Sequence, residues 1–552
     1  MDIMPVFGTV VGGSNPSRCT SISMNKNNID TSKIPDYVTH VTSVLKNGGF
    51  EAFLVGGGVR DLILGRDPKD WDVTTNAKPE QIIPLFEKTV YENNFGTVAI
   101  CIPKDSIIDE STKQNYQRSD TSKKIRPMIA HKEELSSVIG NETKYNIIEV
   151  TPYRVESEYT DFRHPDKIKF SNNLEDDLKR RDFTMNALAL DYKGQLIDLY
   201  KGQSDIKDKI IKAVGNPEDR FREDALRMLR AIRFGTQLGF TIEYETMQAV
   251  VNNANLIKKI SGERIRDEFI KIVESDKPGV GIAMLSKLGL LKYIIPELEQ
   301  GISCAQGGAH IYDVFEHCLQ ALDHSAKKGF SKEVRLAALF HDIGKPKSKR
   351  IPTGAKFHMK PTFYGHEVIG AKTAEKIMGR LKFPRKTTDL VVSLIRNHMF
   401  FSDTETITLS AVRRMIQKVG KEHIWELMEV RECDRVGMNK KEAPYRLRKY
   451  HAMIEEVLHD PISVGQLVIN GEILIKELHM KPGPRMGWIL NALLEEVLGE
   501  PSKNTKEYLV GRVKELDSMS DEDLKKLGKS GKEKREEAEN KEIEKLHKKH
   551  GV

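Results

Sequence analysis

Two aspartates stand two positions apart in the segment DWDVTT, where Asp70 and Asp72 flank a tryptophan. In an extended strand, residues two apart point to the same face, so the two carboxylates would project together. Oxygen ligands at this spacing suit a hard cation such as Mg²⁺, which keeps waters and substrate phosphates in its remaining positions. Taken alone, the triplet is common and fits a solvated strand end equally well. Its interpretation depends on what accompanies it.

A glycine-rich turn precedes these aspartates, in the segment LVGGGVRD. It contains Gly56 and Gly57, and the helix predicted to begin near Val59 carries Arg60. Backbone N–H groups at a turn that enters a helix bind phosphate. A run of glycines is usually only a permissive turn. Next to two carboxylates, it indicates a phosphate that approaches a bound cation.

A third carboxylate is Glu149, which stands alone among the apolar residues of NIIEV. It would join the metal site if its strand lay next to that of the aspartates. The alternative is a solvated strand edge.

Asp224 and Arg227 lie in EDALRMLR, a segment predicted to be helical, where positions three apart share a face. An aspartate accepts from an exocyclic amine, and an arginine donates to a ring nitrogen or carbonyl. Cytosine and adenine both present an amine beside an acceptor, whereas uracil and guanine present a carbonyl beside an N–H. The pair therefore fits a pocket that accepts C and A. The simpler alternative is a surface ion pair.

The surrounding elements fall into two parts. An amphipathic helix is predicted in IPDYVTHVTSVLKNGG, ended by Gly48 and Gly49. Short apolar runs follow, and EAFLVGG, DWDVTT, GTVAICI, YNIIEVTPYR, NALALD and QLIDLY predict strands of one sheet within residues 35–200. A polar stretch at 103–144 predicts an insertion between two strands. From about Ile206 the strand signal disappears and helical periodicity takes over.

Composition limits the class of protein. The chain has 552 residues, 39% hydrophobic and 30% charged, which favours a soluble protein of several domains. Its net charge of +7 permits a nucleic-acid partner without requiring one. Five cysteines without CxxC spacing are typical of a reducing cytoplasm. The sequence contains no apolar run long enough to span a bilayer, so we expect no membrane partner. The first residues do not resemble a secretory signal.

The ordered motifs of the first 300 residues resemble those of the class II nucleotidyltransferases, the family of CCA-adding enzymes and bacterial poly(A) polymerases. LVGGGVRDLILGRDPKDWDVTTNA carries the glycine turn and the paired aspartates. After it come EVTPYR at 149–154, DLKRRDFTMNALALD at 177–191, IDLYKGQSDI at 197–206, RFREDALRMLRAIRFGTQLGF at 220–240 and SGERIRDEF at 261–269. The resemblance covers about residues 34–300.

This resemblance implies a multidomain fold, with an N-terminal α/β domain of DNA polymerase β-like palm type followed by all-α domains. The expected parts are an arm at 1–33, a head at 34–200, a helical neck at 201–300, an HD domain at 301–442 and a helical tail at 443–552. It also implies template-independent addition of CCA to the 3′ end of tRNA from CTP and ATP, in the cytoplasm.

The implied metal ligands in the head are Asp70 and Asp72 for Mg²⁺, with Glu149 as a further catalytic carboxylate. The residues implied to bind the nucleotide are Gly57, Arg60, Asp161, Arg163, Arg181, Asp182, Asn186, Asp224, Arg227 and Arg230. Asp161 and Arg163 lie in a segment similar to the family's flexible loop. That loop favours full CCA addition, while poly(A) synthesis or partial addition of CC or A remains the alternative.

Downstream, HIYDVFEHCLQAL, LAALFHDIGKP and RECDRVGM place a His-Asp doublet between an earlier histidine and a later aspartate. This order resembles the HD phosphohydrolase domain and implies a divalent transition metal bound by His317, His341, Asp342 and Asp434. Lone helical histidines are more often structural, but four groups in this order, with Lys345 after the doublet, favour a metal site. His366 and His398 would serve a second metal or bind phosphate. Such a domain could be an active phosphohydrolase or a scaffold, and a rival hypothesis makes it the working enzyme behind an RNA-binding front half.

Overall fold

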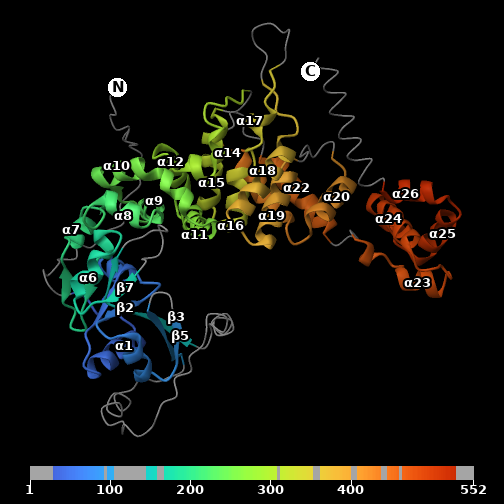
Figure 1. The fold of residues 1–552 in the computed structure, drawn as a ribbon. Coiled ribbons are helices and arrows are strands. Elements are labelled where there is room, and N and C mark those ends of the chain that lie inside the picture. Colours follow the sequence, from blue (N-terminus) through green and yellow to red (C-terminus); the bar gives the residue numbers. More distant parts are fainter. Residues whose placement is uncertain are drawn as a thin grey trace. The chain divides into compact units, whose positions relative to one another are not determined.

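The computed structural model describes residues 29–92, 96–104, 145–157, 167–307, 311–351, 361–399, 407–436, 444–458 and 463–529. The chain divides into two compact units, the first ending at Asp208 and the second beginning at Lys209 (Figure 1). Four predicted features lie outside the described residues. They are the N-terminal arm up to residue 28, most of the 103–144 insertion, the loop with Asp161 and Arg163, and the chain end after 529.

The first unit is built on a seven-stranded sheet in the order β3-β4-β5-β2-β1-β8-β9. Its strands are β1 Ala52–Val55, β2 Asp72–Thr75, β3 Thr89–Glu92, β4 Thr97–Pro103, β5 Tyr145–Pro152, β8 Leu188–Leu190 and β9 Leu196–Asp198. Within this sheet β2 and β5 are parallel, whereas the other neighbouring strands are antiparallel. A separate ribbon pairs β6 Arg154–Ser157 with β7 Lys167–Phe170. The predicted mixed sheet is confirmed.

Short helices complete this unit. They are α1 Asp36–Asn47, α2 Gly57–Ile63, α3 Pro79–Ile82, η1 Ile83–Leu85, α6 Leu174–Lys179, η2 Thr184–Asn186 and α7 Gly202–Lys207. Helix α1 buries Val38, Val41 and Leu45 on one face and ends before Gly48, as its apolar spacing predicts. Two predicted boundaries shift: α2 begins at Gly57 rather than near Val59, and β2 begins at Asp72, so Asp70 precedes the strand.

The second unit is mainly helical. Its first part contains α8 Pro217–Glu223, α9 Leu226–Leu238, α10 Tyr244–Asn253, η3 Ala254–Lys259, α11 Gly262–Val273, α12 Pro278–Lys287, α13 Leu291–Ile294 and α14 Pro296–Glu299. The prediction that strands end near Ile206 is wrong in one detail. Two short strands, β10 Ile210–Ile211 and β11 Thr241–Ile242, pair in parallel there. Two residues per strand are too few to give an alternating pattern.

The rest of this unit contains α15 Val314–Lys327, α16 Lys332–Phe340, α17 Lys345–Ser348, α18 His366–Arg380, α19 Arg385–Asn397, α20 Leu409–Val419, α21 Ile424–Asp434 and α22 Pro444–Val457. After these come η4 Val464–Gln466, α23 Gly471–Lys476, α24 Pro484–Gly499, η5 Pro501–Lys503, α25 Lys506–Asp517 and α26 Asp521–Lys529. Small side chains let α15, α16 and α21 pack closely, because Ala321, Ala338 and Cys433 form one buried cluster. In the described part of the chain, no helix has the length and apolar character needed to cross a bilayer.

Candidate functional sites

The carboxylates of the first unit gather where β2 and β5 lie side by side. Asp72 is the register partner of Glu149 in the parallel pair, which meets the condition set for Glu149 by the sequence. Partners in a sheet project to the same face, about 4.8 Å apart at the backbone. Asp72 is half-buried, while Asp70 and Glu149 are exposed. The strands therefore present two carboxylates on one face, with a third two residues before Asp72.

The turn that precedes α2 lies against this group. Gly56 has a φ of 77°, a conformation that side chains rarely adopt. A Cβ at Gly56 would lie 3.3 Å from Oδ2 of Asp72 and 3.3 Å from Nη1 of Arg181. A carboxylate and a guanidinium thus border the glycine from two elements distant in sequence. A ligand that approaches the Gly56 backbone would meet both charges.

Other predicted nucleotide-binding residues form an internal network in this unit. Arg60 is buried, and its Nη1 donates to Oδ1 of Asn186 at 2.9 Å. Its Nε and Nη2 donate to Oδ1 of Asp61 at 2.9 and 2.8 Å. Asn186 in turn donates from Nδ2 to Oδ1 of Asp182, 3.1 Å away, and the same oxygen accepts from the backbone N–H of Phe183. The network ties α2 to η2 and to the residues just before it.

Asp177 anchors the arginine pair of the same segment. Its buried carboxylate receives Nη2 of Arg180 at 2.6 Å and Nη2 of Arg181 at 2.9 Å. Burial alone would raise the pKa of Asp177, but the guanidinium groups of Arg181 and Arg180 hold that pKa below its ordinary value. Asp177 was not among the predicted site residues. Its place four residues before Arg181, a spacing of about one helical turn, was the available signal.

The predicted base-reading pair is arranged differently from expectation. EDALRMLR is not one helix, because α8 ends at Glu223 and Asp224 is extended, with φ −140° and ψ 103°. Asp224 accepts from Nη1 and Nη2 of Arg264 at 3.3 and 2.8 Å, and its Oδ1 also accepts the N–H of Leu226 at the start of α9. Arg227, on α9, donates to Glu223 at 2.6 Å. The prediction that Asp224 and Arg227 share a helix face is therefore wrong.

Arg264 was missed as an individual residue, although the sequence singled out its segment SGERIRDEF. It lies on α11, 40 residues from Asp224, so no local spacing links the two. Arg230 lies on α9 one turn after Arg227, with its guanidinium carbon 5.5 Å from the ring centroid of Phe234.

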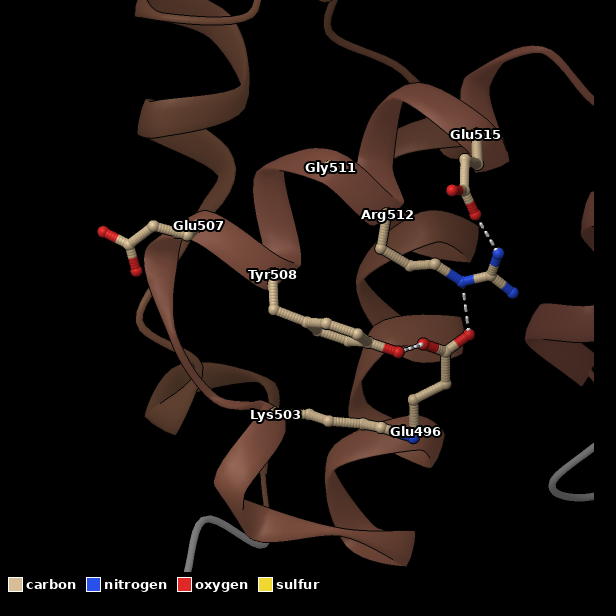
Figure 2. A pocket seen from close by; sticks show the side chains of 7 residues that line it. All are labelled: Glu496, Lys503, Glu507, Tyr508, Gly511, Arg512 and Glu515. Carbon is tan, nitrogen blue, oxygen red and sulfur yellow. Dashed lines mark hydrogen bonds and ion pairs between the residues drawn. The ribbon is translucent and has the colours of Figure 1, made fainter.

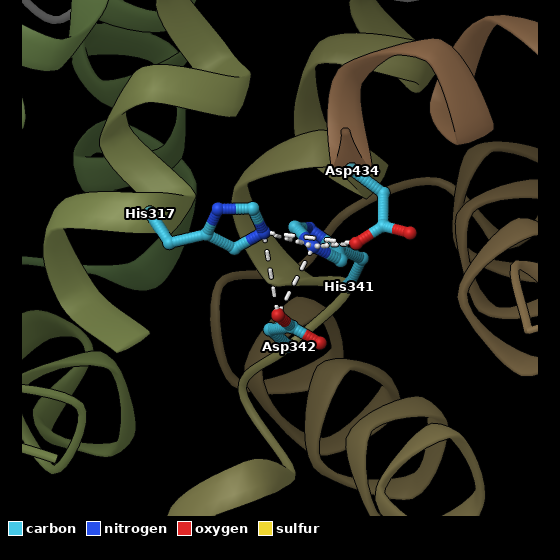
Figure 3. A group of neighbouring side chains, drawn as sticks. All are labelled: His317, His341, Asp342 and Asp434. Atoms are coloured by element: carbon cyan, nitrogen blue, oxygen red, sulfur yellow. Dashed lines mark hydrogen bonds and ion pairs between the residues drawn. The ribbon is translucent and has the colours of Figure 1, made fainter. Parts of the chain in front are cut away.

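The structure brings the four predicted HD ligands together (Figure 3). His317 comes from α15, His341 and Asp342 directly follow α16, and Asp434 ends α21. Nε2 of His317 lies 3.1 Å from Nε2 of His341. Oδ2 of Asp342 lies 3.4 and 3.3 Å from these nitrogens, and Oδ1 of Asp434 lies 3.7 and 3.3 Å from them. No side chain of the four exceeds 5% exposure.

The ionisable side chains in and beside this cluster have strongly shifted pKa values. Burial alone would lower the pKa of His341, but the carboxylates of Asp342 and Asp434 raise it to about 10. Burial and the neighbouring His341 lower the pKa of His398 to about 3. Burial opposes ionisation of Asp342 and Asp434, yet their cationic neighbours keep both carboxyl pKa values well below the ordinary range. Two ionised carboxylates beside imidazole nitrogens provide the donor set for a divalent metal.

Lys345, buried at the start of α17, supports the same cluster. Its Nζ donates to Oδ2 of Asp342 and to Oε1 of Gln306, at 2.6 Å in both cases. Gln306 is buried as well, and was not predicted from sequence. An amide outside any motif gives no signal before its partner is placed.

A further cavity, of about 590 Å³, lies between α24 and α25 (Figure 2). Its lining contains Glu496, Lys503, Glu507, Tyr508, Gly511, Arg512 and Glu515. Glu496 accepts from the Tyr508 hydroxyl at 3.0 Å and from Nε of Arg512 at 2.7 Å. None of the residues predicted to act in catalysis lines this cavity. Its Glu496, Tyr508 and Arg512 side chains already hydrogen-bond to one another.

Comparison with protein families assigns the same regions. Residues 52–126 and 108–212 match the poly A polymerase head domain, and 239–302 match the probable RNA and SrmB-binding site of polymerase A. Residues 309–439 match the HD domain. The sheet with its paired carboxylates therefore belongs to a nucleotidyltransferase of the poly(A) polymerase type, joined to an HD domain.

Full-length relatives narrow the class. A CCA-adding enzyme of Ligilactobacillus salivarius is 32% identical over 487 residues, covering 88% of this chain and 98% of the relative. One of Lactobacillus helveticus is 30% identical, covering 89% and 100%. The solved structure of the Bacillus stearothermophilus CCA-adding enzyme in complex with CTP matches with a TM-score of 0.60 and 26% identity, over 87% of this chain and 97% of that chain. The chain belongs to the family of CCA-adding enzymes.

Proposed function

We propose that this chain adds C, C and A to the 3′ end of tRNA from CTP and ATP, and that its first unit carries out the transfer. The observation that carries the assignment to this unit is the register of Asp72 with Glu149, next to Asp70 and the Gly56 turn. Membership of the CCA-adding family and the likeness to a relative solved with CTP support the choice of substrates.

In the proposed reaction, the 3′-oxygen of the RNA attacks the α-phosphorus of the incoming nucleotide. A P–O bond forms, the bond to the β-phosphate breaks, and pyrophosphate leaves. Asp70, Asp72 and Glu149 would hold Mg²⁺, which lowers the pKa of the attacking hydroxyl and neutralises charge on the pyrophosphate. An all-carboxylate set with exposed members fits a cation that retains water and substrate oxygens.

Other residues of the first unit are assigned to binding the nucleotide. Arg181 borders the Gly56 turn and faces Asp72 across it, so we assign it to the triphosphate. Arg60, Asp182 and Asn186 form one buried network, and we assign them to positioning the ribose and phosphates through the segment that they fix. Gly57 starts α2, and a Cβ there would lie 3.7 Å from Nη2 of Arg60.

Base choice is assigned to Asp224 and Arg227, with Arg230 assisting. Asp224 is extended and held through both carboxylate oxygens by Arg264, which sets its direction without a helix. Arg227 is held by Glu223 and follows Asp224 on α9. Hydrogen-bond selection of this kind rejects the wrong base because buried polar groups would be left unpaired. The roles of Asp161 and Arg163 stay predictions.

For the second unit we propose a metal-dependent phosphohydrolase centre made of His317, His341, Asp342 and Asp434. The burial of all four side chains around converging nitrogen and oxygen atoms supports metal binding at this centre. The neck, HD and tail boundaries and the cytoplasmic location stay predictions.

The test uses tRNA that lacks its 3′ CCA, incubated with CTP, ATP or both, and sequenced at the ends. We expect CC from CTP alone and a defined CCA end from the mixture. A homopolymer of A would indicate that the chain is a poly(A) polymerase and not a CCA-adding enzyme. No extension would overturn both and favour the HD centre as the working enzyme.

A further inference from the structure

Helix α11 contacts both parts of the proposed base-reading pair. Near its start, Arg264 donates from both Nη atoms to the Asp224 carboxylate. One turn later, Glu268 forms an ion pair with Arg233 on α9, with 3.2 Å between Oε2 and Nε. Both side chains of that pair are buried. Because α9 also carries Arg227, α11 connects Asp224 to the helix of its proposed partner.

The helices around this connection are closely packed. A Cβ at Gly281 on α12 would lie 2.5 Å from Cγ2 of Ile272 on α11 and 2.7 Å from Oγ1 of Thr236 on α9. Only a glycine therefore leaves room for α12 against both neighbours. A tightly packed core transmits a shift of one element to the next. We expect a displacement of α11 to move Asp224 and α9 as well.

The first turn of α11 contacts the region that matches the HD domain, residues 309–439. A Cβ at Gly262 would lie 2.5 Å from the carbonyl oxygen of Arg380, the last residue of α18. Arg266 donates from Nη1 to the carbonyl oxygen of Lys382, just beyond that helix. The glycine and the arginine together hold the start of α11 against the end of α18.

The other end of α11 is held by Arg335, which lies on α16 of the HD region. Its Nη1 donates to the carbonyl oxygen of Val273, the last residue of α11, at 3.2 Å and to that of Ser275 at 3.1 Å. Its Nε donates to the carbonyl oxygen of Phe330 at 3.0 Å. The last carbonyls of a helix lack partners within the helix and carry partial negative charge. A guanidinium binds them in a fixed geometry.

We propose that Arg335 and Arg266 are positioning residues for nucleotide selection. Through them the HD region holds α11 at both ends, and α11 in turn holds Asp224 and α9. The inference rests on the base choice assigned above to Asp224 and Arg227, and it deepens that assignment. It gives the HD region a part in nucleotidyl transfer that does not depend on hydrolysis.

The experiment uses the full chain and tRNA that lacks its 3′ CCA, and it measures kcat/KM for CTP and for UTP. Arg335→Ala should lower the CTP-to-UTP ratio about 3- to 10-fold, a size typical of coupling through packed elements. Arg266→Ala should lower the ratio less, because it removes one hydrogen bond. Arg335→Lys should recover part of the ratio, since an ammonium group still donates to carbonyls.

Arg385→Ala is the matched control. Arg385 lies on α19 of the same region, its side chain is 78% exposed, and it pairs with Asp389 on its own helix. This change should leave the ratio as in wild type. General damage to the fold would lower kcat/KM for both nucleotides alike and leave their ratio unchanged. Thermal melts establish that each variant is folded, and Arg266→Ala keeps the test available if Arg335→Ala is not.

A double change tests the route of the effect. Arg264→Ala removes the contact between α11 and Asp224, so Arg335→Ala should have less effect in that background than in wild type. The two factors would multiply fully if Arg335 acted elsewhere, and this result would overturn the inference. An unchanged ratio in both Arg335→Ala and Arg266→Ala would overturn it too.

Failure of the proposed function gives a different result. Wild type would then form no CCA ends, or would use UTP as readily as CTP. Wild type that forms CCA ends and rejects UTP, with variants that reject UTP equally well, would defeat only the role of the HD region in nucleotide selection.

Discussion

The two candidate metal centres differ in how much of the coordination shell the chain supplies. In the first unit, Asp70 and Glu149 are exposed, and the only donors proposed are carboxylates. In the second, the ligands are buried and combine imidazoles with carboxylates. An open carboxylate group leaves positions for a nucleotide, whereas a buried mixed group is assembled by folding. The first is suited to a cation that arrives with substrate, and the second to a resident ion.

The largest expected effect is on transfer, from loss of a head carboxylate. Asp72→Ala or Asp70→Ala should reduce CMP and AMP incorporation at least about 1,000-fold, because several kcal/mol of transition-state charge stabilisation depend on the ion. The measurement is incorporation of labelled nucleotide into truncated tRNA. Asp67→Ala is the control, since Asp67 lies in the same loop with a side chain 93% exposed. Full activity in Asp72→Ala would refute the metal assignment.

Loss of an HD ligand should act on the other centre alone. His341→Ala should abolish any phosphohydrolase activity while CCA addition continues, because the transfer chemistry is assigned to the first unit. Metal should also stabilise the wild-type second unit, by about 2.7 kcal/mol at a concentration 100 times the dissociation constant. Thermal melts with and without Mn²⁺ measure this shift. Equal loss of both activities would indicate structural damage instead.

Discrimination between bases should weaken when either Asp224 or its partner Arg264 is removed. Asp224→Ala should lower discrimination between CTP and UTP about 10- to 100-fold, since a few kcal/mol of selective hydrogen bonding are lost. Arg264→Ala should lower it less, because the carboxylate remains but loses its direction. Competition between labelled nucleotides gives the ratio. Arg222→Ala, at a side chain 63% exposed, should change nothing. Unchanged selectivity in Asp224→Ala would contradict the pairing argument.

The smallest effect concerns stability rather than activity. The pKa of Asp177 is lowered in the folded state, so its contribution is complete above the ordinary pKa of 3.8 and is lost as the pH falls through the lower folded value. Asp177→Asn should therefore destabilise the first unit at pH 7, by about 3 kcal/mol. The difference from wild type should shrink below pH 3.8 in urea titrations. Glu175→Gln, exposed on the same helix, is the control.

The contrast also explains what sequence alone could predict. Asp70 and Asp72 are close in the chain and were grouped by period-two spacing, although Asp70 precedes β2 and is not part of the strand. The condition on Glu149 was met because β5 lies beside β2. His317 and Asp434 lie on helices that are distant in the sequence, and they were grouped through family resemblance. Spacing could not have joined them.

The failures have local causes. EDALRMLR contains good helix formers and no glycine or proline, so no helix-breaking residue marked the break at Asp224. There the Asp224 side chain accepts the backbone N–H of Leu226, the first residue of α9. Arg264 and Gln306 contact their partners only after long-range packing.

The most direct test of two separate centres assays one set of proteins twice, by end sequencing of truncated tRNA given CTP and ATP and by counting bound Mn²⁺. The account predicts CCA ends and bound Mn²⁺ for wild type. Asp72→Asn should lose the ends and keep the Mn²⁺ of the HD cluster, and Asp342→Asn should show the reverse. Absence of CCA ends from wild type, or loss of both properties from either single change, would contradict it.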